Sequence, residues 1–195
     1  MSYCDGSIIG LVENNGNLYL SEDGGNSWGM ASEDAHSTLV SITTPQSWQK
    51  IRMSNDGETI VSVSDGGISG SGNIFIGNAI EFTTINQPTI INKPWKSVDI
   101  SGDGNTIVAV ADKDFIYVGN STIMTSKENK RRWKDIKISG DGSTIIACAT
   151  GVAGSEGEIS WLDGGVFISY NSGVSWSQIQ NTNDWSAVAI SENGL

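Results

Sequence analysis

Aliphatic residues alternate with other residues in short segments along the whole chain. Four segments carry an aliphatic pair two positions apart, shortly after a Trp: Ile51 and Met53, Val98 and Ile100, Ile136 and Ile138, Val188 and Ile190. A period of two is typical of a β-strand with one buried face. No window of helix length has apolar residues at a spacing of 3.6. The pattern therefore predicts an all-β chain.

These segments belong to one repeated frame. A Trp is followed by an aliphatic residue three positions later, another two after that, then Ser and a turn that ends in Gly. The frame begins at Trp48, Trp95, Trp133 and Trp185, and Cys4–Ile9 matches its second half. The turn glycines are Gly6, Gly57, Gly104, Gly142 and Gly194, a mean period of 47 residues. This period is typical of a four-stranded propeller blade.

Each frame is followed by further strand-like segments. Second strands are predicted at Ser7–Val12, Thr59–Ser64, Thr106–Ala111 and Thr144–Ala149, and third strands at Gly16–Ser21, Gly72–Gly77, Phe115–Gly119 and Val166–Tyr170. Small residues on one face of the second strands would let a neighbouring sheet approach closely. We therefore expect a β-propeller of four-stranded antiparallel blades. A β-sandwich is the alternative, but its strands would not be expected to repeat in sequence.

We expect residues 1–195 to form a single propeller domain. Its repeats are approximately 1–47, 48–94, 95–132 and 133–184. Residues 185–195 are expected to close onto 7–12, with Trp185–Ser191 pairing with Ser7–Val12 in a composite last blade. Because an unpaired strand edge recruits another chain, two chains that exchange these strands are an alternative, as is a segment of a longer propeller. The expected state is thus a monomer or a strand-exchanged homodimer.

A sharper motif ends two of the third strands. Ser21-Glu-Asp23-Gly-Gly25-Asn-Ser27-Trp28 fits Ser-x-Asp-x-Gly-x-Thr/Ser-Trp at every position, and Ser169-Tyr-Asn171-Ser-Gly173-Val-Ser175-Trp176 fits with Asn in place of Asp. These segments resemble Asp-boxes, also called BNR repeats. The flanking frame is similar to propellers of the photosystem II assembly-factor, sortilin, xyloglucanase and sialidase types. The resemblance implies hairpin turns between third and fourth strands, and it is unspecific for activity.

The motif residues are expected to have structural roles. The Asp23 carboxylate can accept backbone N–H bonds within its own turn, and Gly25 can adopt a positive φ cheaply. The Trp28 ring is expected to be buried beside the turn. The structural set is Ser21, Asp23, Gly25, Trp28, Ser169, Asn171, Gly173 and Trp176.

The residues give little support to catalysis. A sialidase resemblance would imply three separated arginines that clamp a carboxylate, but the only arginines are Arg52, Arg131 and Arg132. His36 is the single histidine, and no Gly-x-Ser-x-Gly segment accompanies it. An inverting glycosidase needs only two suitably spaced carboxylates and remains an alternative. We predict no catalytic residue, no cofactor and no metal site.

Charge and loop lengths favour a binding module. The net charge of −11 disfavours nucleic acid and anionic membrane as partners. Loops of unequal length on one face of a repeat array often mark a binding face. The candidate binding surface on it comprises Trp161, Lys127, Lys130, Arg131 and Arg132. The expected function is a non-catalytic module that binds a protein partner or a glycan. The alternatives are a glycoside-acting enzyme and a structural component of a larger particle.

Overall fold

The computed structural model describes residues 6–30, 45–78, 82–151, 164–181 and 183–194. Within these ranges the regular elements are β-strands and one 3-10 helix, η1 (Gly67–Ser69). None of these residues belongs to a helix long and apolar enough to cross a membrane. The strands are β1 (Ile9–Val12), β2 (Asn14–Gly16), β3 (Leu18–Ser21), β4 (Gly29–Met30), β5 (Gln46–Met53), β6 (Ile60–Ser64), β7 (Ile74–Gly77), β8 (Phe82–Thr84), β9 (Trp95–Ile100), β10 (Ile107–Gly119), β11 (Met124–Ile138), β12 (Ile145–Ala149), β13 (Gly165–Ser169) and β14 (Ser177–Gln180).

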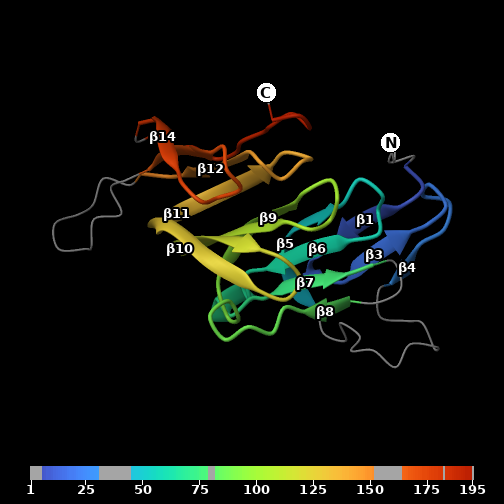
Figure 1. Ribbon diagram of the computed structural model, residues 1–195. Helices are drawn as coiled ribbons and strands as arrows, with labels where there is room; N and C mark the ends of the chain where they lie inside the picture. The colour runs from blue at the N-terminus through green and yellow to red at the C-terminus, as the bar shows by residue number, and fades with distance from the viewer. Residues whose placement is uncertain (1–5, 31–44, 79–81, 152–163, 182, 195) are drawn as a thin grey trace.

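The strands form antiparallel sheets that correspond to four successive blades (Figure 1). The first blade contains β1, β3 and β4, and the second contains β5 to β8, with β2 paired along β5. The third and fourth blades share one continuous sheet, because β10 and β11 are long strands that each pair with two other strands. Residues 107–111 of β10 pair with β9 and residues 112–119 pair with β11, whereas residues 133–138 of β11 pair with β12. The all-β blade architecture is as predicted.

Each complete blade is built around the Trp of the repeated frame. This Trp packs edge-on against an aromatic residue of the third strand: Trp48 on Phe75, Trp95 on Tyr117 and Trp133 on Phe167, with ring centroids 4.8, 5.3 and 5.3 Å apart. All three Trp side chains are buried. Indole rings supply much of the apolar area that each small sheet buries.

Small residues of the second strands lie where neighbouring blades meet. Ser62 of the second blade, Ala109 of the third and Ala147 of the fourth are all fully buried. Side chains of successive blades share the hydrophobic clusters: Ala109 packs in one cluster with Val61 of the preceding blade. The small face therefore permits the close blade-to-blade approach that the sequence predicts.

Hydrogen bonds between the tight turns that follow the first strands join successive blades. The N–H of Asn55 donates to the carbonyl of Gly102 at 2.9 Å, that of Gly102 to Gly140 at 2.8 Å, and that of Gly140 to Glu192 at 2.8 Å. Residues 185–194 thus occupy the place of the first strand and turn of a further blade, although none of them belongs to a strand.

The predicted pairing of Trp185–Ser191 with Ser7–Val12 is not seen in this structure. Strand β1 pairs with β3, and among the described residues it has no partner on its other edge. Figure 1 shows β1 and the C-terminal segment apart. The C-terminal segment is instead held against the fourth blade, where the N–H of Gly140 donates to the carbonyl of Glu192 and the N–H of Val188 donates to the Asp135 carboxylate.

Candidate functional site

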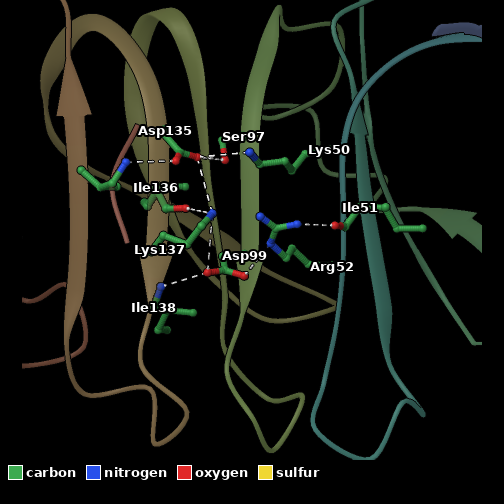
Figure 2. A network of polar contacts seen from close by, with 10 residues as sticks. Lys50, Ile51, Arg52, Ser97, Asp99, Asp135, Ile136, Lys137 and Ile138 are labelled. Atoms are coloured by element: carbon green, nitrogen blue, oxygen red, sulfur yellow. Dashed lines mark hydrogen bonds and ion pairs between the residues drawn. The ribbon is translucent and has the colours of Figure 1, made fainter. Parts of the chain in front are cut away.

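The first strands of three blades carry a network of charged side chains, here called the inner-strand network. Its members are Lys50 and Arg52 of β5, Ser97 and Asp99 of β9, and Asp135 and Lys137 of β11 (Figure 2). Along each first strand, these residues alternate with the aliphatic residues that face the blade core. The network therefore lies on the side of the first strands that does not face a blade core, and it links the second, third and fourth blades.

Lys137 lies between the two carboxylates of this network. Its Nζ is 3.5 Å from Asp135 Oδ1 and 4.0 Å from Asp99 Oδ2. Lys50 Nζ reaches Asp135 Oδ1 at 3.6 Å, across the intervening third blade. Arg52 Nε lies 3.4 Å from Asp99 Oδ1. The two cations of β5 are the solvent-facing members, with side chains 30% and 36% exposed, whereas both carboxylates are buried.

Further hydrogen bonds hold both carboxylates in place. Asp135 accepts from Ser97 Oγ at 2.6 Å and from the N–H of Val188 at 3.2 Å. Asp99 accepts from the N–H of Ile138 at 3.2 Å. With these donors and the cations around them, the carboxylate oxygens have little capacity left for a substrate. The arrangement is suited to holding first strands together at a spacing where their backbones do not pair.

The environments of the two carboxylates shift their pKa values in opposite directions. Burial raises the pKa of Asp99, and the nearby charges of Lys137 and Arg52 only partly offset it. Burial also acts on Asp135, but the hydrogen bond from Ser97 and the charge of Lys137 outweigh it and lower the pKa of Asp135 below 3.8. Burial lowers the pKa of Lys137. Since burying a charge costs desolvation energy, the two carboxylates and Lys137 depend on their partners more than the two cations of β5 do.

Sequence reasoning missed this network. It used the aliphatic positions of the first strands and ignored the alternate ones, where Lys50, Asp99 and Asp135 lie. Charged residues at the alternate positions of two neighbouring first strands, with opposite signs, were the signal that could have found it. The partners are far apart in the chain, so the pairing itself needed the fold.

A second feature is a cavity of about 490 Å³, here called the Lys93–Lys130 cavity. The segment after β8 contributes Lys93, β10 contributes Asp114, Phe115 and Tyr117, and β11 contributes Lys130. Asp114 pairs with Lys93 Nζ at 2.5 Å and lies 3.7 Å from Lys130 Nζ. Two ammonium groups therefore share one carboxylate, which leaves this cavity with an excess of positive charge in an acidic protein.

Aromatic rings line the same cavity. Lys93 Nζ lies 5.3 Å from the centre of the Tyr117 ring and Lys130 Nζ lies 5.0 Å from that of Phe115, distances at which a cation is attracted to a π face. The Lys130 side chain is 51% exposed, whereas that of Lys93 is 19% exposed. Burial tends to lower the pKa of Lys93, but hydrogen bonds to Asp114 and Tyr117 outweigh it, and the pKa is raised.

The predicted basic surface is divided among different environments. Lys130 lines the cavity, whereas Arg131 Nη2 pairs with Glu128 at 3.3 Å and its guanidinium packs over the Phe167 ring at 4.3 Å. Arg132 lies 3.7 Å from Asp112. Lys127 lies on β11 opposite Ile116 of β10. Trp161 lies outside the described residues. Of the four candidates among the described residues, the structure brings only Lys130 to the cavity.

The two sharper motifs, here called the box turns, contain matching hydrogen bonds. In the first, Gly25 N–H donates to Ser21 Oγ at 2.8 Å and Ser27 N–H donates to Asp23 Oδ1 at 2.8 Å. Trp28 Nε1 donates to the Gly25 carbonyl at 3.1 Å. In the second, the corresponding donors are Gly173, Ser175 and Trp176, and their acceptors are Ser169, Asn171 and the Gly173 carbonyl, at 2.9, 2.9 and 3.2 Å. In both turns the motif side chains make hydrogen bonds within the turn.

One expectation about the box turns was wrong. Trp28 was expected to be buried, but it is 43% exposed. Its counterpart Trp176 is partly buried and packs against the core of the fourth blade. The Trp28 ring lies beside Gly25, which has no side chain to cover it. The hydrogen bond to the turn fixes the ring position, while burial depends on what the neighbouring elements supply.

Among the described residues, no group of three or more His, Cys, Asp or Glu side chains lies close enough together to hold a metal ion.

Comparisons with known proteins agree on the fold. No family model matches the sequence. No curated protein matches it either. Among solved structures, 99% of the chain superposes on the tricorn protease with a TM-score of 0.64 and 14% identity, and 97% on an ancestral GH74 enzyme with a TM-score of 0.63 and 16% identity. For YCF48 bound to D1 peptide, 90% superposes with a TM-score of 0.54 and 13% identity.

The fold is that of a β-propeller. At these identities the likeness concerns architecture alone. The chain spans 18% of the tricorn protease chain, 27% of the GH74 enzyme and 51% of YCF48.

Proposed function

We propose that this chain is a non-catalytic propeller module that binds a protein partner through a peptide segment seated in the Lys93–Lys130 cavity. The observation that carries the proposal is the pairing of two ammonium groups with only one carboxylate beside the Phe115 and Tyr117 rings. The excess charge suits a carboxylate of the peptide, and the rings suit an adjacent apolar side chain. The box turns in this proposal are BNR repeats with a purely structural role.

The similarity to YCF48, whose structure holds a D1 peptide, supports a peptide as the partner. A glycan is the second candidate, because an aromatic ring beside hydrogen-bonding groups also suits a sugar. Catalysis by Asp99 and Asp135 is not part of the proposal. Their pKa values are shifted apart, as in an acid–base pair, but their oxygens are engaged by Arg52, Lys137, Ser97 and backbone N–H groups.

A peptide selection followed by titration tests the proposal. Peptides are selected from a displayed random library on the whole chain, and their affinities are measured by calorimetry. Lys130→Ala and Phe115→Ala should each weaken binding about tenfold, the loss of one cation–π or ion-pair contact. Lys127→Ala is the matched control, because it removes an equal charge from the same strand outside the cavity, and its affinity should equal the parent's.

Two outcomes would overturn this assignment. Selected peptides that bind Lys130→Ala and the parent equally would place the site elsewhere. The second outcome is that no peptide is selected, while the chain binds a defined oligosaccharide on a glycan array and Phe115→Ala abolishes that binding. The ligand would then be a glycan.

A further inference from the structure

The outer edge of the third blade is formed by residues 124–127 of β11, here called the β11 edge. These residues pair with β10 on one side, and no described strand pairs with them on the other. At Met124 a side chain takes the place of a strand: Gln87 Oε1 accepts from the Met124 N–H at 2.8 Å, and Gln87 Nε2 donates to the Met124 carbonyl at 2.8 Å. These are the two bonds that one residue of an antiparallel neighbour would make.

Ser126 is the next residue on this edge whose backbone has the same orientation. Because backbone groups alternate in direction along a strand, its N–H and carbonyl point away from β10, as those of Met124 do. Within the described ranges neither group has a hydrogen-bond partner, and Ser126 is exposed. The regular edge ends after Lys127, since Glu128 has a φ of 56° and the register with β10 shifts there. The β11 edge therefore offers one short, open pairing site.

This pairing site adjoins the Lys93–Lys130 cavity. Ser126 lies directly opposite Tyr117 of β10, so the two side chains share one face of the sheet. Both residues line the cavity, and Lys93 Nζ lies 5.3 Å from the centre of the Tyr117 ring. The residue of an added strand that pairs with Ser126 would have its side chain on the same face. That side chain would therefore lie on the side of the two ammonium groups.

We propose that the peptide partner adds to the β11 edge as a short antiparallel strand, with an Asp or Glu at the residue that pairs with Ser126. This inference rests on the proposed function and assigns the backbone register and the recognised residue. The occupant is an acidic peptide because Lys93 and Lys130 share the single carboxylate of Asp114. Gln87 already holds an amide group against this edge, so its geometry suits a peptide backbone.

Ser126→Pro tests the backbone contact. Proline is tolerated in an edge strand where its nitrogen faces outward, so pairing with β10 should persist while the open donor is removed. Calorimetry with the selected peptides should show about tenfold weaker binding than for the parent, as expected for the loss of a backbone contact. Ser126→Ala is the matched control: it removes the hydroxyl but keeps the N–H, and its affinity should equal the parent's.

Methylation of the peptide backbone tests the same contact on the unaltered protein. One nitrogen of the selected peptide is methylated at a time, and in an added strand only alternate N–H groups face β11. Affinity should fall about tenfold at the residue that pairs with Ser126 and stay unchanged at the residues before and after it. The acidic residue whose replacement by Ala has no further effect in Lys130→Ala should be this same residue.

Two results would overturn the added strand: equal affinities of Ser126→Pro and the parent, or methylation losses without alternation. If Lys130→Ala still weakened binding in that case, the proposed peptide site would stand and only this inference would fail. If Lys130→Ala bound the peptides as the parent does, the proposed function itself would fail. A parent of twice the 20.7 kDa chain mass that becomes monomeric in Ser126→Pro would assign the edge to a second copy instead.

Discussion

The carboxylate of Asp135 accepts a hydrogen bond from the N–H of Val188 at 3.2 Å and so connects the fourth blade to the segment that follows it. The same carboxylate accepts from Ser97 of the third blade and pairs with Lys50 of the second. One buried side chain thus links its own first strand to three other first-strand positions. Removal of this side chain should therefore weaken contacts between several blades.

Asp135→Ala should destabilise the protein by about 3–5 kcal/mol, because it leaves the partly buried Lys137 without one of its two carboxylates. Urea unfolding provides the measurement. Lys50→Ala is the matched control: its side chain is 30% exposed, and its removal should cost about 0–1 kcal/mol. Equal midpoints for the two variants would contradict the structural role of Asp135.

The two carboxylates of the network should give opposite pH dependences. The pKa of Asp135 is lowered in the folded state, so its contribution to stability is present above its ordinary pKa of 3.8 and is lost as pH falls below that value. The pKa of Asp99 is raised, so its ionisation opposes folding as pH rises. The stability of Asp135→Asn relative to the parent should therefore be highest at low pH. The stability of Asp99→Asn relative to the parent should be highest at neutral pH.

Melting temperatures of both variants at pH 3 and pH 7 would check these signs. If the two variants changed in the same direction relative to the parent between the two pH values, the opposite environments of Asp99 and Asp135 would be refuted.

Asp23→Asn should lower the melting temperature less than Asp23→Ala does. Asn171 already makes the corresponding bond to Ser175 N–H in the second box turn, so an amide oxygen keeps this hydrogen bond although the charge is lost. The side-chain and backbone hydrogen bonds from Ser27 lower the pKa of Asp23 to about 2, so the first turn should keep its carboxylate ionised down to near that pH. Differential scanning fluorimetry compares the variants, and a loss in Asp23→Asn as large as in Asp23→Ala would show that the charge itself is required.

Trp133→Ala should cost about 3–5 kcal/mol, as expected for a large buried ring. Trp133 is fully buried, whereas Trp28 is 43% exposed. Trp28→Ala should therefore cost less, about 1–2 kcal/mol, through lost partial burial. Chemical denaturation of the two variants gives the comparison, and a cost for Trp28→Ala that matches Trp133→Ala would mean that another element covers Trp28.

Much of the architecture could be predicted because its causes are local or periodic. Each Ser-x-Asp-Gly turn is closed by bonds between near neighbours, as when Ser54 Oγ donates to Asp56 at 2.6 Å, so its residues are visible in a short window of sequence. The alternation of Ile136 and Ile138 follows from the pleat of a strand. The frame repeats because every blade needs the same Trp, the same small face and the same turn.

Tertiary structure alone decided the contacts between segments. Lys50 meets Asp135 across the intervening blade, and the Lys93–Lys130 cavity joins residues from three segments. The exposure of Trp28 and the open edge of β1 depend equally on what lies beside them. The residue pattern of one strand predicts which of its faces is buried. Which side chains of different blades meet depends on how the blades pack. That packing is a property of the whole fold, so it cannot be derived from any single segment.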